Sequence, residues 1–149
     1  MEREGVSERQ GRMVLDANVL VSAVNSRDAN HVACYCFLRE RPEVQWVVPT
    51  LAYFEFQAAQ SRIRREGGKA LRELHLPNVE LVDVTANMLR EASAAGLFDD
   101  LASLRGADLV YGCVAALQDI PLATSDLGFR AVEDRIRIVW VSPQSGEAG

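Results

Sequence analysis

Short apolar segments alternate with longer helix-like stretches along most of this chain, and this alternation restricts the fold more than any other feature. Five apolar runs, each bounded by turn-forming or charged residues, lie at residues 13–15, 46–48, 79–84, 121–123 and 136–141. Strands that alternate with helices pair in parallel and are covered on both faces. The pattern therefore predicts an α/β fold with a mainly parallel sheet of about five strands.

Apolar residues at helical spacing fill the intervals between these runs. They predict helices over residues 18–24, 29–39, 50–66, 85–95 and 105–118. Gly67-Gly68 and Gly96 mark two of the helix ends, because glycine readily adopts the left-handed conformation that often terminates a helix. Trp46 and Trp140 lie in strand-like runs, so we expect both indole rings in the core.

Length and composition place the chain among single-domain globular proteins. It has 149 residues, of which 48% are hydrophobic and 25% charged, as is usual for one folded domain. We expect that domain at residues 13–142, with flexible tails at residues 1–12 and 143–149, and either Met1 or Met13 as the natural start. No apolar run reaches the roughly 20 residues that cross a bilayer. The charged first residues are unlike a secretion signal, so we expect a cytoplasmic protein with no membrane partner.

The charge balance and the missing glycine-rich motifs exclude several classes of function. Sixteen basic and 21 acidic residues give a net charge of −5, so the surface as a whole repels polyanions, which excludes non-specific coating of nucleic acid. A nucleic-acid enzyme stays possible where bound cations reverse the charge locally. No Gly-x-Gly or P-loop motif is present, so we expect no nucleotide cofactor. His31, Cys34 and Cys36 have a spacing open to metal binding, but on an apolar helix they are better explained as core and surface residues.

Four acidic residues stand where strands and helices meet. Asp16 directly follows the first apolar run, and Asp126 comes just after the fourth. Glu55 lies near the start of one predicted helix and Asp108 in the first turn of another, both among apolar neighbours. Because open α/β sheets bind their ligands at the carboxyl ends of the strands, we expect these acids to converge on one site.

Each acid also has an ordinary structural explanation. Asp16 and Asp126 suit the N-caps of the segments that follow them, Asp108 suits a helix dipole, and Glu55 has Arg62 as a possible ion-pair partner. Four converging carboxylates without paired bases, however, call for a cation. Oxygen ligands favour hard ions such as Mg²⁺ or Mn²⁺.

Four short motifs follow one another in a distinctive order. They are VLDANVLVSAV at residues 14–24, PTLAYFEF at 49–56, RGADLVYGCVAAL at 105–117 and PLATSDLGFRAV at 121–132. In this order they resemble the motifs of PIN domains, in particular the ribonuclease toxins of VapBC toxin–antitoxin systems. The resemblance implies a three-layer α/β/α fold with a central twisted, mainly parallel sheet, and an endoribonuclease that cuts RNA with Mg²⁺ or Mn²⁺.

The same resemblance implies a set of site residues. Four catalytic acids would bind one or two metal ions, and two polar residues would orient coordinated water. The acids are Asp16, Glu55, Asp108 and Asp126, and the polar supports are Asn18 and Thr124. Some relatives carry a further acid where this chain has Gly112, which leaves the second metal ion open.

Partners are also implied by the resemblance. It indicates a homodimer and a cognate VapB-like antitoxin whose tail covers the active groove. Helices 18–24 and 29–38 offer an apolar patch as the contact, because Val19, Leu20, Val21 and Val24 exceed what one buried face needs. For RNA, the chain has one basic cluster, which could equally be a solvated helix end. It includes Arg62, Arg64, Arg65 and Lys69.

Two alternative functions stay open at this point. Other α/β phosphohydrolases with strand-end acids, such as haloacid-dehalogenase-type phosphatases, rely on a lysine near their aspartates, as do receiver domains. Here the single lysine, Lys69, lies away from the strand ends, and the phosphatase Asp-x-Asp motif is replaced by Asp16-Ala17-Asn18. The second alternative is a non-catalytic module of the same fold that binds RNA or protein.

Overall fold

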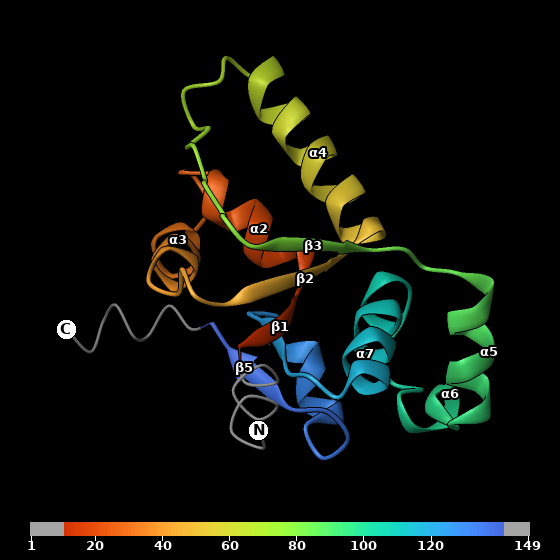
Figure 1. Cartoon of the computed structure of the whole chain (residues 1–149). Helices are drawn as coiled ribbons and strands as arrows, with labels where there is room; N and C mark the ends of the chain where they lie inside the picture. The colour runs from red at the N-terminus through yellow and green to blue at the C-terminus, as the bar shows by residue number, and fades with distance from the viewer. Residues whose placement is uncertain (1–10, 142–149) are drawn as a thin grey trace.

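A five-stranded sheet runs through the centre of the computed structural model, which describes residues 11–141 (Figure 1). The strands are β1 (Arg12–Leu15), β2 (Gln45–Pro49), β3 (Val79–Val82), β4 (Leu122–Thr124) and β5 (Ile138–Trp140). Every neighbouring pair is parallel, in the order β3-β2-β1-β4-β5. The predicted parallel sheet of five strands is therefore confirmed.

Helices cover both faces of this sheet and make it the middle of three layers (Figure 1). They are α2 (Ala17–Val24), α3 (His31–Arg39), α4 (Thr50–Arg65), α5 (Ala86–Ala94), α6 (Leu97–Asp100) and α7 (Ala107–Gln118), and the 3-10 helix η1 covers Leu127–Val132. Helices α2, α3 and α4 lie on one face, and α5, α6 and α7 lie on the other. Each helix expected from the apolar spacing is present, and the four-residue α6 is an addition.

The strand order places a topological reversal at the centre of the sheet. From β1 the chain builds outward through β2 and β3, and then crosses to the other side of β1 to form β4 and β5. Leu15 pairs with Ala123 in the register of β1 and β4, and the backbone N–H of Asp16 donates to the Ala123 carbonyl at 3.1 Å. The residues that follow β1 and β4 are therefore neighbours, at the point where open α/β sheets bind ligands.

The core lies between the sheet and its two helical layers. Val14, Val47 and Leu122, from three adjacent strands, are fully buried, as expected for parallel strands that are covered on both faces. Trp46 is also in the core, with 1% of its surface exposed. Trp140 is only half-buried, because its indole N–H reaches out to Glu133 at 3.1 Å. The core prediction is confirmed for the first tryptophan and holds only in part for the second.

The predicted apolar contact patch on α2 and α3 is wrong for most of α2. Val19, Leu20 and Val24 are all buried inside the chain, and Val21 alone of the four is half-exposed. The reason is that α2 packs against α3 and α4 as well as against the sheet, so more than one of its faces is covered. On α3, Val32 is exposed.

The interpretation of the histidine and cysteines on α3 as core and surface residues fits the structure. His31 is buried, with Nδ1 2.9 Å from the Ser22 carbonyl oxygen. Cys34 is fully buried and Cys36 half-buried, and both thiols are free.

Of the two predicted tails, the structure describes only residues 11 and 12. Arg12 already belongs to β1, and the rest of the predicted tails, residues 1–10 and 143–149, lies outside the described residues. Within residues 11–141, no helix has the length and apolar character needed to span a membrane.

Candidate active site

Asp16 occupies the buried centre of the candidate site. It follows β1 directly, serves as the N-cap of α2 and is 1% exposed. Its Oδ1 accepts a hydrogen bond from the Asn18 backbone N–H at 3.1 Å, and its Oδ2 accepts one from the Thr124 hydroxyl at 2.6 Å. Both carboxylate oxygens are thus held in place by neighbours in the fold.

Thr124 joins Asp16 to the second strand-end acid. Its hydroxyl oxygen accepts a hydrogen bond from the backbone N–H of Asp126 at 3.0 Å, while the hydroxyl donates to Asp16. Asp126 in turn caps η1, because its Oδ1 accepts from the Gly128 N–H at 2.9 Å. The capping explanation is therefore confirmed for both strand-end aspartates, and capping is what fixes their positions.

The other two acids come from helices. Asp108 is half-buried in the first turn of α7, and Glu55 is an exposed residue of α4. Glu55 is oriented by Tyr111, whose hydroxyl donates to its Oε1 at 2.6 Å. The sequence analysis missed Tyr111, which is 1% exposed. Its spacing of three residues from Asp108 was an available signal, because residues three apart share a helix face.

The pKa values indicate that the four carboxylates form one electrostatic unit. The pKa of Asp108 is raised to about 6, mainly by burial and further by the charges of Asp16, Asp126 and Glu55 and a hydrogen bond with Asp126. Burial also raises the pKa of Asp16, with smaller contributions from Asp126 and Glu55, against the lowering effect of its hydrogen bonds with Thr124 and Asn18. Like charges that gather in this way make the anionic form of each carboxyl unfavourable.

No basic side chain relieves this repulsion within the described residues. The ion pairs there involve other acids, so the possible pair between Glu55 and Arg62 is not formed. The donor set consists of carboxylate and hydroxyl oxygens, which fits a hard divalent cation. Yet among residues 11–141 no three His, Cys, Asp or Glu side chains are arranged to hold a metal ion. Binding an ion there therefore requires the carboxylates to rotate toward one another.

Gly112 does not occupy a place where a further acid could join the cluster. A Cβ atom added there would lie 2.9 Å from Leu104 Cδ1 and 3.2 Å from Leu101 Cδ1. The position therefore faces apolar side chains, and a larger residue there would require Leu104 and Leu101 to shift. Close packing explains the glycine.

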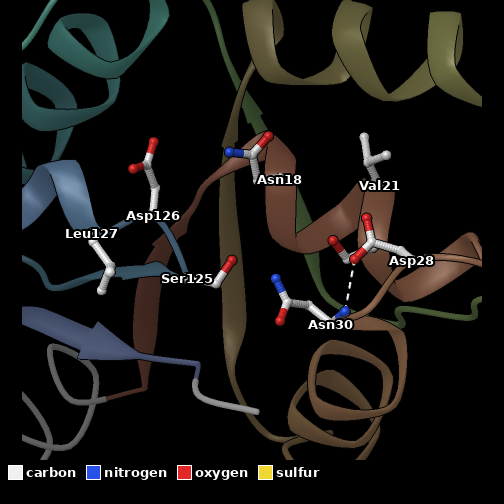
Figure 2. Close-up of a pocket in the computed structure, with 8 residues that line it drawn as sticks. Asn18, Val21, Asp28, Asn30, Ser125, Asp126 and Leu127 are labelled. Carbon is white, nitrogen blue, oxygen red and sulfur yellow. Dashed lines mark hydrogen bonds between the residues drawn. The ribbon is translucent and has the colours of Figure 1, made fainter.

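Asn18 lies at the rim of the acid cluster. It is exposed on the first turn of α2, and its backbone N–H, not its side chain, bonds to Asp16. Its side chain lines a cavity of about 470 Å³ together with Asp126 and Ser125 (Figure 2). The structure thus brings Asn18 and Thr124 to the same edge of the sheet as the acids.

The predicted basic cluster lies apart from the acids. Its residues are exposed in the last turn of α4 and just beyond it, the end of α4 that lies away from the sheet (Figure 1). Arg64 is about 14 Å from Glu55 along the helix axis, from the rise per residue. Within the described residues these four side chains form no ion pair. They are Arg62, Arg64, Arg65 and Lys69.

Comparison with known proteins gives one family and a structural neighbour. A family model described as PIN domain matches residues 13–135. The chain is similar in structure to one described as VapBC2 from Rickettsia felis bound to a DNA fragment from their promoter. The TM-score is 0.58 at 15% sequence identity, and the alignment covers 88% of this chain and 99% of that one. At this identity the likeness concerns the fold. No curated protein matched the chain.

Proposed function

The chain belongs to the PIN domain family, and from this premise we propose that it is a metal-dependent endoribonuclease, the toxin of a type II toxin–antitoxin system. The observation that carries the proposal is the convergence of four carboxylates, where burial first, and then the charges of the other three acids, raise the pKa of Asp108 to about 6. A fold that keeps such a cluster without a basic partner bears a cost in stability, and a bound divalent cation offsets that cost.

Each side chain has a distinct role in this proposal. Asp16, Asp108 and Asp126 are the principal ligands of Mg²⁺ or Mn²⁺, with Glu55 as the fourth acid. Such an ion supplies an activated water near neutral pH and neutralises charge on the phosphate oxygens. The bonds of Thr124 to both strand-end aspartates keep Asp16 and Asp126 in register.

Glu55 is suited to accept a proton from the attacking water. It is exposed, and it is held by a hydrogen bond from Tyr111 to one oxygen only. Asn18 stands at the rim, where its amide can orient a water that approaches Asp126. Its neutral side chain adds a donor to the site without adding to the negative charge.

The proposed substrate is RNA, and only a limited basic part of the surface attracts it. A net charge of −5 repels polyanions over most of the surface. We propose that the exposed bases at the end of α4 contact the RNA backbone on the Glu55 side of the site. These contacts involve Arg62, Arg64, Arg65 and Lys69.

The experiment is cleavage of a mixed RNA pool by the full chain, with Mn²⁺ and with EDTA. We expect cleavage with Mn²⁺ only, and we expect Asp108→Asn to abolish it. Asp99→Asn, an exposed aspartate on α6 away from the cluster, is the matched control and should cleave normally. Equal cleavage by Asp108→Asn would mean another active site or a contaminating nuclease, and the proposal would fail.

The alternatives predict different results in the same experiment. A non-catalytic binding module would retain the RNA without cleaving it under either condition. A phosphohydrolase of another class would act on a small phosphate ester and leave the RNA pool intact. The observation that favours cleavage is the site itself, because a binding module gains nothing from an unpaired acid cluster.

We also propose two protein partners, a VapB-like antitoxin and a second copy of the chain, in the cytoplasm. The structural neighbour is described as a VapBC2 complex. Next to Glu55 in the sequence, Phe54 is 75% exposed, and an exposed apolar ring that adjoins an acid of the cluster suits an antitoxin tail with basic and apolar residues. Sedimentation of the isolated chain tests the dimer. Co-purification with the product of a neighbouring small gene, weakened by Phe54→Ser, tests the antitoxin.

A further inference from the structure

A polar cavity adjoins the acid cluster, and apart from Asn18 and Asp126 its lining residues have no role in the function described so far. It has a volume of about 470 Å³ and shares Asp126 with the cluster. Figure 2 shows it between the end of β4, helix α2 and the start of α3. Its other principal side chains are Asn18, Val21, Asp28, Asn30, Ser125 and Leu127.

The charges of this cavity exclude a phosphate as its direct occupant. Among the residues that the structure describes, no lysine, arginine or histidine lines it, whereas Asp28 and Asp126 both do. A phosphate group would be repelled by these two carboxylates. The cavity therefore suits a neutral group that can donate hydrogen bonds.

Asn30 offers an unused amide to such a group. It stands at the N-cap position of α3, yet its side chain makes no capping bond. Its backbone N–H donates instead to Asp28 Oδ1 at 2.8 Å, which fastens the turn before the helix. Figure 2 shows the side chains of Asn30 and Ser125 facing one another across the cavity. Neither makes a hydrogen bond with another described residue, so both can bind a ligand.

The cavity also has apolar side chains beside these polar groups, so that it can contact both the face and the edge of a flat ring. Leu127 is 60% exposed at the rim, and Val21 is half-exposed on α2. Unpaired RNA bases are recognised by contact with their faces and by hydrogen bonds to their edges. Asp28 supplies an acceptor, because its Oδ2 has no hydrogen-bond partner among the described residues.

We propose that this cavity binds one base of the RNA, on a nucleotide next to the phosphodiester held at the acid cluster, and that it disfavours uracil. Adenine, cytosine and guanine each carry an exocyclic amino group that can donate to Asp28, whereas the one donor on the base-pairing edge of uracil, its N3–H, lies between two carbonyl oxygens that a carboxylate repels. This inference rests on the proposed function. It adds a recognition site that sets the sequence preference of cleavage.

The first test measures binding without cleavage. Five-nucleotide RNAs, each with one abasic position, are titrated into full-length Asp108→Asn with Mn²⁺. We expect the abasic change to weaken binding at one position by roughly tenfold, the usual scale for loss of one stacked base. When Asn30→Ala is added, the abasic change should weaken binding by less, because the base that it removes no longer has Asn30 as a hydrogen-bond partner. Adding Asn87→Ala, an exposed asparagine on α5, should leave the full penalty.

The second test maps the ends of fragments that the wild-type chain and Asn30→Ala release from a random RNA pool. We expect the wild type to avoid uridine at one position beside the cut and Asn30→Ala to accept it more readily. The variant loses no helix-capping bond, so the expected result does not depend on a folding defect.

Four results would overturn the assignment. Cleavage without any base preference, or an unchanged preference in Asn30→Ala, would show that the cavity reads no base, while the proposed function would survive. Inhibition by argininamide, with abasic RNAs bound as well as intact ones, would assign the cavity to a cationic side chain of a protein partner. Absence of Mn²⁺-dependent cleavage by the wild type would overturn the proposed function as well.

Discussion

The acid cluster has two halves, which the fold holds in different ways. The strand-end half consists of Asp16, Thr124 and Asp126, and the helix half of Glu55, Asp108 and Tyr111. In the strand-end half, both acids cap the segments that follow them, and Thr124 bonds to both. In the helix half, Glu55 is held by a single hydrogen bond from Tyr111.

Under the proposed function, this difference separates residues that serve both folding and chemistry from residues that serve chemistry alone. Asp16 and Thr124 are almost fully buried, so changing them disturbs packing and capping as well as the site. Asp108 is half-buried, and its environment opposes its charge. Removing charge from the helix half should therefore raise stability, and removing polar partners from the strand-end half should lower it.

The largest expected effect is that of Asp108→Asn. If Asp108 binds the metal directly, cleavage should fall by at least about 100-fold, the upper range found for residues that only support a ligand. Stability of the metal-free protein should change in the opposite direction. The pKa of Asp108 is raised to about 6 from its ordinary value of 3.8. The folded state therefore binds the proton more tightly than the unfolded state, and stability decreases as the pH rises between these two values.

Thermal unfolding in EDTA from pH 3 to pH 8 checks this expectation. The melting temperature of Asp108→Asn should equal that of the wild type near pH 3. It should exceed the wild-type value by a growing amount as the pH rises toward 6, and by a constant amount above that. Asp99→Asn serves again as the control for removal of one negative charge. A lower melting temperature for Asp108→Asn at neutral pH would show that the aspartate stabilises α7 and would contradict the repulsion argument.

Thr124→Val tests the strand-end half and should have the next largest effect. The substitution keeps the shape of the side chain but removes the donor to Asp16 and the acceptor for the Asp126 N–H. Leaving buried polar groups without partners should lower the free energy of unfolding by about 1–3 kcal/mol. Urea unfolding measures it, and Thr124→Ser, which keeps the hydroxyl, should recover most of the loss. Equal stability of the valine and serine variants would mean that the hydroxyl does not organise this half.

The contrast between the halves also explains which parts of the site the sequence could predict. Asp16 and Asp126 follow apolar runs directly, and parallel strands end at one edge of the sheet, so their proximity followed from periodicity. Tyr111 could not be recognised in the same way, because it lies in the apolar stripe of α7. Its partner Glu55 is 56 residues away, a contact that only the tertiary structure reveals.

The same limit applies to the fold as a whole. Strands and long helices were predictable because their spacing is a local property, whereas the four-residue α6 is too short to show a period. The number of helices that cover α2 is a tertiary property, so the buried Val19 and Leu20 were wrongly taken for surplus apolar surface. Asn30 likewise became a candidate only once the connection between α2 and α3 was placed beside β4.

Tyr111→Phe is expected to have a smaller effect that is confined to the chemistry. Phenylalanine preserves the buried ring and removes only the hydroxyl that orients Glu55. We expect cleavage to fall by about tenfold, the lower range for loss of a supporting hydrogen bond. The loss should appear in kcat more than in KM, with stability almost unchanged. Tyr53→Phe, on the exposed side of α4, is the matched control and should cleave normally. Equal activity of the two variants would remove Tyr111 from the site.

The smallest effect is expected at Asp119, an acid at the opposite end of α7 from Asp108. It is the C-cap residue and adopts a left-handed conformation, with φ 54° and ψ 49°. Asp119→Gly should stabilise the chain by about 1 kcal/mol or less, because glycine adopts this conformation without a Cβ penalty, while its greater freedom in the unfolded chain offsets part of the gain. Its ion pair with Arg137 is exposed and contributes little. Asp119→Gly removes one negative charge from the same helix as Asp108→Asn, and we expect a higher melting temperature with normal cleavage. If Asp119→Gly also lowers cleavage, the loss of activity in Asp108→Asn comes from the changed charge of α7 and not from the position of Asp108 in the acid cluster.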